Sequence, residues 1–211
     1  MSIKAMVFDV DGTLLDTREF IIAAFEHSLR ANGHVVPMRQ RIVEVATGRT
    51  LDECYPLLAP NGDAILLRDT HREFQMKRFD LVTAYAGLHD VLTVLRERGL
   101  LLGVCSIRGP MTRPMLEHVQ ALTHFDAAVD SSDVKKHKPH PEGVLKVLTL
   151  LNVKPEDSVM VGDTTSDIEA GKAAGCAKTI AITHGLGTRE SLEKSGADHI
   201  VTSLPDILPL V

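Results

Sequence analysis

The chain has 211 residues, a formal net charge of -5 and a hydrophobic content of 44%, enough apolar side chain to bury a core and too much for wholesale disorder. Aromatic residues make up only 4%, tryptophan is absent, and lysine and arginine are scattered along the chain. This composition gives little support to base stacking or to a basic nucleic-acid-binding surface, so we expect no nucleic-acid partner.

The cysteines and the apolar runs indicate where in the cell the protein is expected. Cys54, Cys105 and Cys176 have no paired spacing, so neither a disulfide framework nor a zinc site is predicted. The first residues do not resemble a signal peptide, and no apolar run approaches the ~20 residues that span a bilayer. We therefore expect a cytoplasmic protein with no membrane partner, either a monomer or a homodimer.

Short apolar runs typical of buried strands recur along the chain. They span 5–8, 100–105, 127–129, 158–161, 179–182 and, more weakly, 199–201. Helical patterns at 88–98, 141–151 and 167–174 are each followed by Gly or Asn, which tolerate the left-handed conformation that closes a helix. This alternation predicts an α/β fold, a Rossmann-like parallel sheet with helices on both faces and catalytic residues at the carboxyl ends of the strands.

One stretch breaks the alternation. Residues 17–82 show no convincing strand, and five apolar side chains recur there at helical spacing: Phe20, Ile21, Ala24, Phe25 and Leu29. A second helical pattern covers 64–79. We predict an all-helical insert over 17–82, with 1–16 and 83–211 forming the sheet domain.

The first strand ends in two closely spaced carboxylates. Alternation along an extended segment places Asp9 and Asp11 on the same side, with Val10 opposite. At ~4 Å and an effective dielectric constant near 20, two such charges repel by ~4 kcal/mol. A divalent cation, or a proton kept by one carboxyl group, relieves this repulsion. Asp16 lies beyond the glycine turn and is interpreted as a hinge or helix-start residue.

Further polar residues follow the later strands. Asp163 ends the strand near Val161, and Asp167 opens the next helix. Oxygen ligands of this kind suit Mg²⁺, which takes one or two carboxylates together with waters and substrate phosphate. Ser106 places a hydroxyl at the same sheet edge, and Lys138, followed by Pro139 and Pro141, is a candidate point charge for phosphate. Each residue alone also fits a turn or a solvated loop.

Taken together, Asp-x-Asp-Gly-Thr, Ser106, Lys-Pro-x-Pro and Gly-Asp-x-x-x-Asp resemble, in this order, the four motifs of the haloacid-dehalogenase-like phosphohydrolase superfamily. The segments VFDVDGTLLDT and VGDTTSDIEAGKAAG look most similar to its phosphoglycolate-phosphatase-like branch, and the helical insert matches a cap domain. The resemblance implies a Mg²⁺-dependent phosphatase that hydrolyses a small-molecule phosphomonoester through an aspartyl-phosphate. The alternatives are a phosphomutase or pyrophosphatase of the same fold, or a non-catalytic phospholigand-binding protein.

The resemblance also implies a role for each matching residue. Asp9 is the expected nucleophile and Asp11 the general acid and base. Ser106 and Lys138 are expected to hold the phosphoryl oxygens. The metal-binding set it implies is Asp9, Asp11 (through its backbone carbonyl), Asp163 and Asp167. The substrate-binding set we expect is Gly12, Thr13, Ser106, Ile107, Lys138, Arg49 and Arg108.

Departures from the branch pattern concern the substrate. Ile107 and Arg108 follow Ser106 where the branch often has Asn, and His137 precedes Lys138 where the branch commonly has Gly. Arg108 adds a bidentate anion binder near the site. In the insert, Arg49 is interpreted either as a ligand of an anionic leaving group or as an exposed turn residue. Phosphoglycolate itself is therefore not assumed as the substrate.

Overall fold

The computed structural model describes residues 2–211 and divides into two compact units. Unit 1 comprises Met1–Asp16 and Ala84–Val211, and unit 2 comprises Thr17–Thr83. Within the described residues, no helix combines the length and apolar character needed to cross a membrane. Each unit has its own core, and the two are described separately below.

Unit 1 is built on a six-stranded sheet in the order β5-β4-β1-β6-β7-β8, with every pairing parallel. Its strands are β1 (Ala5–Phe8), β4 (Leu101–Cys105), β5 (Ala127–Val129), β6 (Ser158–Gly162), β7 (Lys178–Ile182) and β8 (His199–Val201). All six lie within two residues of the predicted runs. The predicted parallel α/β sheet is confirmed.

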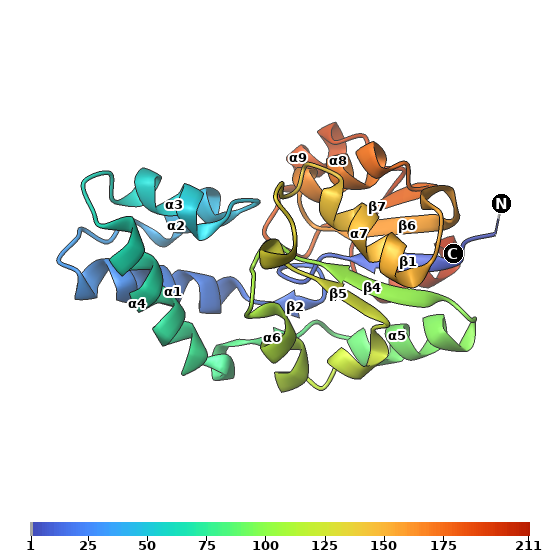
Figure 1. Ribbon diagram of the computed structural model, residues 1–211, viewed down its shortest axis with the longest axis horizontal. Helices are drawn as coiled ribbons and strands as arrows, with labels where there is room; N and C mark the ends of the chain where they lie inside the picture. Colours follow the sequence, from blue (N-terminus) through green and yellow to red (C-terminus); the bar gives the residue numbers. More distant parts are fainter. Residues whose placement is uncertain (1) are drawn as a thin grey trace. The chain divides into compact units, whose positions relative to one another are not determined.

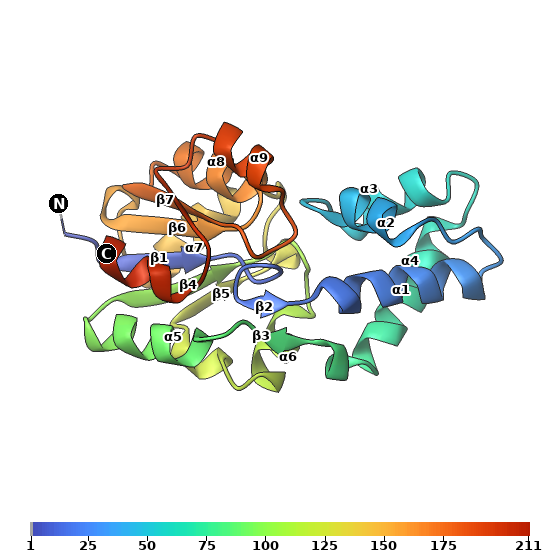
Figure 2. The same ribbon diagram turned by 180° about the vertical axis from the view of Figure 1, so that it is seen from behind.

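Helices cover both faces of this sheet. The α-helices of unit 1 are α5 (Leu88–Glu97), α6 (Thr112–His118), α7 (Glu142–Leu151), α8 (Thr165–Ala174) and α9 (Arg189–Lys194). Short 3₁₀ helices are η2 (Leu122–His124), η3 (Ser131–Asp133), η4 (Pro155–Asp157) and η5 (Pro205–Leu210). Figures 1 and 2 show α7 and α8 on one face, and α5 on the other.

The core follows from the alternation of side chains along β1. Ala5 and Val7 belong to the buried cluster that includes Val144 and Val147 of α7. Phe8 points the other way, and its ring meets that of Phe125 edge-on at 6.3 Å between centroids. Because β1 is central and covered on both faces, all four of its residues are buried, which explains its continuous apolar run.

Unit 2 is helical, with α1 (Arg18–Ala31), α2 (Arg39–Ala46), α3 (Leu51–Leu58), α4 (Ala64–Met76) and η1 (Phe79–Leu81). The five apolar side chains predicted to share one face of the first helix are all buried. Phe25 packs against Tyr55 of α3 and His71 of α4, with centroids 5.2 and 4.6 Å apart. The second predicted helix, expected over 64–79, is shorter than expected: α4 ends at Met76.

Two short strands lie where the chain passes between the units, and sequence patterning did not predict them. β2 (Leu15–Asp16) pairs with β3 (Thr83–Ala84) in a two-stranded sheet. Of the two interpretations of Asp16, helix start is wrong, because it lies in β2 and α1 begins at Arg18. The hinge interpretation stays a prediction, and Asp16 is the last residue before the chain enters unit 2. Strands of two residues are too short to produce a readable hydrophobic period.

Gly103 in β4 provides a test of the packing between the sheet and α7. A Cβ atom at this position would lie 2.3 Å from a methyl group of Val147. Gly103→Ala should therefore lower the free energy of unfolding by about 1–3 kcal/mol, the usual cost of overpacking a core. Urea titration of the variant against the parent protein measures this change.

The matched control is the same substitution in a Val147→Ala background, where the obstructing methyl groups are gone. Gly103→Ala should cost much less there, and the difference is the coupling energy of a double-mutant cycle. Equal costs in the two backgrounds would show that contact with Val147 is not the cause.

Candidate active site

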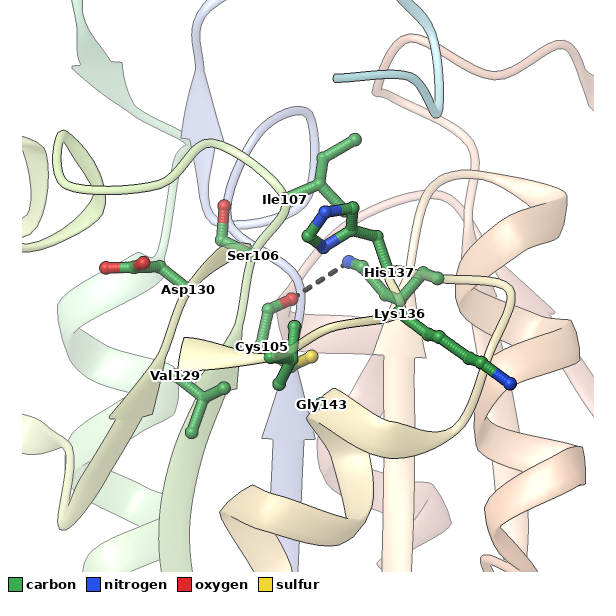
Figure 3. Close-up of a pocket in the computed structure, with 10 residues that line it drawn as sticks. Cys105, Ser106, Ile107, Val129, Asp130, Lys136, His137 and Gly143 are labelled. Carbon is green, nitrogen blue, oxygen red and sulfur yellow. Dashed lines mark hydrogen bonds between the residues drawn. The ribbon is translucent and has the colours of Figure 1, made fainter. Parts of the chain in front are cut away.

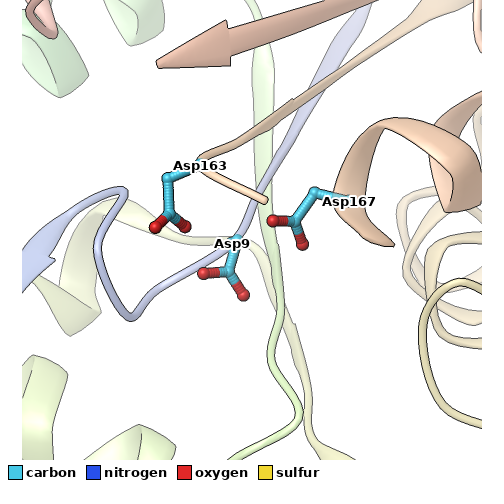
Figure 4. A group of neighbouring side chains, drawn as sticks. All are labelled: Asp9, Asp163 and Asp167. Atoms are coloured by element: carbon cyan, nitrogen blue, oxygen red, sulfur yellow. The ribbon is translucent and has the colours of Figure 1, made fainter. Parts of the chain in front are cut away.

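Three buried carboxylates gather at the carboxyl edge of the sheet. Asp9 directly follows β1, Asp163 follows β6, and Asp167 lies in the first turn of α8. One carboxylate oxygen from each lies within 4.8 Å of those of the other two. Figure 4 shows the three side chains grouped together. β1 and β6 are hydrogen-bonded neighbours, so their ends meet at the same edge of the sheet.

Lys138 joins two of these carboxylates. Its ammonium group donates to Oδ1 of Asp9 and to Oδ1 of Asp167, both at 2.5 Å, and to the backbone carbonyl of Cys105 at 2.9 Å. Figure 3 draws the bond to the Cys105 carbonyl. The lysine side chain is only 4% exposed. Its three donors are therefore used, and the ammonium is held rigidly beside the carboxylate of Asp9.

Burial and the neighbouring charges shift the pKa of Lys138 in opposite directions. Burial by itself lowers the pKa of the lysine, but the carboxylates of Asp167 and Asp9 outweigh it and raise the pKa well above its ordinary value. The lysine is therefore charged at neutral pH. Because it is surrounded by acidic groups, it acts as a fixed positive point charge at the sheet edge.

The acidic groups carry more negative charge than Lys138 neutralises. Burial raises the pKa of Asp9 well above its ordinary value; the Lys138 charge opposes this rise, while the other carboxylates add to it. Burial, reinforced by the Asp167 carboxylate, raises the pKa of Asp163 to about 7. Three buried carboxylates, only partly neutralised by one ammonium group, offer oxygen ligands of the kind that a hard divalent cation binds.

Neighbouring groups orient Asp163 and Asp167. The hydroxyl of Thr13 donates to Asp163 Oδ1 at 3.1 Å, and the backbone N–H of Leu186 donates to its Oδ2 at 2.6 Å. Asp167 Oδ2 accepts from the N–H and hydroxyl of Thr164 in a capping box. Both oxygens of Asp167 thus have protein partners, which suits a residue that holds Lys138 in place.

Gly12 is required by its surroundings as well as by its backbone. It adopts the left-handed region at φ 82°, and a Cβ atom here would lie 2.2 Å from Asp163 Oδ2. Glycine alone allows the turn after Asp11 to approach the Asp163 carboxylate so closely. Gly12 of the first acidic motif therefore leaves the space that the carboxylate of Asp163 in the second acidic motif occupies, about 150 residues later.

Asp11 has a different partner from Asp9. The guanidinium of Arg108 binds both of its carboxylate oxygens, with Nε at 2.9 and 2.8 Å and Nη2 at 2.7 Å from Oδ1. Ser106 ends the neighbouring strand, and its hydroxyl accepts from the N–H of Arg108 at 3.1 Å. The structure thus brings Ser106, Arg108 and Asp11 together at one edge of the sheet.

A small pocket lies beside this group. Ser106 and Ile107 line it together with His137 and Lys138, and Cys105 and Gly143 close its inner side (Figure 3). Three of the residues expected to act on the substrate therefore line one pocket: Ser106, Ile107 and Lys138.

Arg49 lies in unit 2. Its guanidinium donates to the backbone carbonyls of Glu44 and Val45 at the end of α2, both at 3.2 Å. These carbonyls lack partners within the helix, so the arginine helps to cap its carboxyl end.

Several contacts of the site had no signal in the sequence. The N–H of Leu186 and the carbonyl of Cys105 are backbone groups, which no residue pattern identifies. Thr13 was expected as a substrate-binding residue, and the hydrogen bond from its hydroxyl to Asp163 had no signal in the sequence. The ion pair of Arg108 with Asp11 was also not expected, although an anion-binding arginine was predicted at this position.

Comparison with known proteins agrees with this geometry. The family model of haloacid dehalogenase-like hydrolases matches residues 6–182. Two relatives named pyrophosphatase PpaX, from Bacillus mycoides and Bacillus pumilus, are 32% and 34% identical to the chain. Both alignments cover 100% of this chain, with 98% and 97% of the relatives.

Solved structures show the same fold. A predicted phosphoglycolate phosphatase from Haemophilus somnus superposes with a TM-score of 0.91 at 18% identity, covering 100% of this chain and 98% of the other. A predicted phosphatase from Clostridium acetobutylicum reaches 0.87 at 26% identity with the same coverage. The predicted phosphohydrolase class is confirmed, and the chain belongs to the haloacid dehalogenase-like hydrolase family.

Proposed function

We propose that this protein is a Mg²⁺-dependent phosphatase that acts on a small phosphorylated molecule through an aspartyl-phosphate on Asp9. The observation that carries the proposal is the placement of Asp9, which lies at the end of β1 with Lys138 at 2.5 Å and two further carboxylates alongside. A carboxylate held beside a fixed positive charge suits attack on a phosphoryl group, because the charge of the transition state is neutralised as it develops.

Asp9 attacks phosphorus and Asp11 handles the proton. In the first step, an oxygen of Asp9 bonds to phosphorus, the bond to the leaving oxygen breaks, and the leaving oxygen takes a proton from Asp11. In the second step, Asp11 accepts a proton from a water molecule, whose oxygen bonds to phosphorus and releases Asp9. Splitting one displacement into two lowers each barrier.

The hydroxyl of Ser106 holds a phosphoryl oxygen, and Lys138 supplies a fixed positive charge beside it. The N–H groups of Gly12 and Thr13, which were also expected to bind substrate, donate to the carbonyls of Leu15 and Val10 within the turn. The hydroxyl of Ser106 accepts from the N–H of Arg108, so its own hydrogen remains to be donated. Lys138 supplies charge without losing its proton, since its pKa is raised. These groups position the phosphoryl group for attack by Asp9.

The carboxylates of Asp9 and Asp163 and the backbone carbonyl of Asp11 would hold Mg²⁺, with Asp167 behind them. When bound, the ion supplies positive charge to the phosphoryl oxygens and relieves the repulsion among the carboxylates. The raised pKa values of Asp9 and Asp163 support this assignment, because burial, with neighbouring carboxylates adding to it, disfavours their negative charge in the absence of a cation.

The substrate is either a phosphomonoester or inorganic pyrophosphate. The second candidate is favoured by the two relatives named pyrophosphatase, whose similarity extends over the whole chain. Attack by Asp9 on phosphorus can cleave a phosphate ester or a phosphoanhydride by the same two steps. A phosphomutase and a non-catalytic binding protein receive no comparable support. Location in the cytoplasm and a monomeric or homodimeric state stay predictions.

Asp9→Asn tests the covalent mechanism. The amide cannot attack phosphorus, so phosphate release should fall to background for every compound that the parent protein hydrolyses. The measurement is phosphate release with Mg²⁺ across pyrophosphate and a panel of phosphorylated metabolites. Full activity of Asp9→Asn would exclude the aspartyl-phosphate, and no release by the parent protein from any compound would exclude the phosphatase function.

Asp11→Asn tests the proton-transfer role. The asparagine keeps the size of the side chain but can neither give nor take the proton, so kcat should fall by ~10²–10⁴ for an alkyl phosphate. Steady-state kinetics on such a substrate measures the loss. A loss below about tenfold would remove Asp11 from proton transfer, since an alcohol leaves poorly without a proton.

The charge of the cluster predicts how Mg²⁺ affects stability. With its pKa raised from 3.8 to about 7, folded Asp163 keeps a proton that the unfolded chain has already released. Its contribution to stability is full below its unfolded pKa and is lost as pH rises through about 7. Mg²⁺ replaces that proton, so it should raise Tm more at about pH 8 than at about pH 6.

Thermal unfolding with Mg²⁺ or with a chelator at the two pH values measures this effect. The control is Asp163→Asn, which removes both the titrating group and a proposed ligand, so its Tm should respond weakly to Mg²⁺ at either pH. Equal Mg²⁺-induced shifts of the parent protein at the two pH values would contradict the assignment.

A further inference from the structure

The ion pair between Arg108 and Asp11 is a contact of the site that the chemistry proposed above does not use. The guanidinium of Arg108 grips both oxygens of Asp11 at 2.7–2.9 Å, and the two side chains are only 11% and 12% exposed. A nearly buried bidentate pair of this kind is strong and directional. It engages the carboxyl group that must act on the leaving oxygen of the substrate.

The backbone around Arg108 fixes its position relative to the phosphoryl site. Its N–H donates to the hydroxyl of Ser106, and Ser106 is itself tied to β5 through a backbone bond to Val129. Gly109 follows in the left-handed region at φ 77°. The guanidinium therefore extends from a constrained turn that also carries a phosphate-binding hydroxyl.

The location of the guanidinium follows from the role of Asp11. A general acid must come within hydrogen-bond reach of the oxygen that it protonates, so Asp11 lies beside the bridging oxygen during catalysis. A cation bound to both oxygens of Asp11 then lies on the side of the leaving group. Its planar set of N–H donors matches a phosphate or a carboxylate.

We propose that Arg108 is a specificity-determining residue that binds negative charge on the leaving group. The site would thus favour phosphorylated compounds in which a second phosphate or a carboxylate lies next to the bridging oxygen. This inference rests on the proposed phosphatase function and names its substrate class. On binding, Arg108 exchanges Asp11 for the anion of the substrate, and Asp11 turns to the bridging oxygen.

Charge balance explains why a neutral leaving group is a poorer substrate. Separating Arg108 from Asp11 removes a paired carboxylate from a nearly buried guanidinium, which is costly. An anionic leaving group supplies a replacement partner, whereas an alcohol or a phenol does not. The exchange therefore proceeds at little cost only for leaving groups that carry their own charge.

The alternative is that Arg108 merely positions Asp11. In that case its loss slows every substrate that needs Asp11 by a similar factor. A specificity role instead affects anionic leaving groups selectively, and it affects KM more than kcat. The two roles therefore differ in a ratio between substrates, which a general loss of activity does not change.

The experiment compares Arg108→Gln and Arg108→Lys with the parent protein on three probes in the presence of Mg²⁺. Inorganic pyrophosphate and 2-phosphoglycolate carry anionic leaving groups, and phenyl phosphate carries a neutral one. Arg113→Gln is the matched control, because it removes one positive charge from α6, where the arginine donates to the carbonyl of Ala128. Its substrate ratios should equal those of the parent protein.

We expect Arg108→Gln to raise KM for at least one anionic probe by about tenfold or more relative to phenyl phosphate, as befits loss of a charge-assisted contact. Arg108→Lys should recover part of this loss, since it keeps the charge without the bidentate geometry. Should the glutamine variant not fold, the lysine variant is expected to show the same selective loss to a smaller degree.

A binding measurement supports the kinetics. In the Asp9→Asn background, calorimetry should show pyrophosphate binding weakened by Arg108→Gln and binding of phenyl phosphate nearly unchanged. Equal losses on charged and neutral probes would overturn the inference and leave a positioning role. A parent protein that hydrolyses phenyl phosphate but neither anionic probe would also overturn it, while the phosphatase function would stand. Inactivity on every compound would refute the phosphatase function itself.

Discussion

The contact between the Lys138 ammonium and the carboxylates of Asp9 and Asp167 is the constraint on which the site depends. It links the end of β1, the approach to α7 and the start of α8 through two 2.5 Å contacts. Buried charges are stable only when they are paired and hydrogen-bonded. Asp163, oriented by Thr13 and Leu186, completes the acidic cluster beside this charged group.

The two aspartates of the first motif are kept apart by different cations. Strand alternation led us to expect two mutually repelling carboxylates, and a shared cation or proton to relieve them. Instead Asp9 is paired with Lys138, whereas Asp11 is paired with Arg108. Asp9 is thus held within the acidic cluster, and Asp11 faces the connection that follows β4.

Much of the fold was predictable because its elements are local. β1, β5 and β8 match the predicted runs, and α7 and α8 end at Asn152 and Gly175 in the left-handed conformation. Such signals lie within a few residues of the element that they define. The two-residue strands β2 and β3 had no such signal, and the helix-start interpretation of Asp16 was consequently wrong. The candidate residues were found because the motif order resembles a known family.

The sequence by itself determined the parallel α/β core, the helical insert, the family and the identity of the residues gathered at the sheet edge. Only the tertiary structure decided which side chains pair there. The contacts of Asp11 with Arg108, of Asp9 with Lys138 and of Thr13 with Asp163 span 97, 129 and 150 residues. Hydrophobic period and turn chemistry act over one or two turns of chain, whereas these pairings arise when separate strand ends converge on one buried and poorly solvated edge.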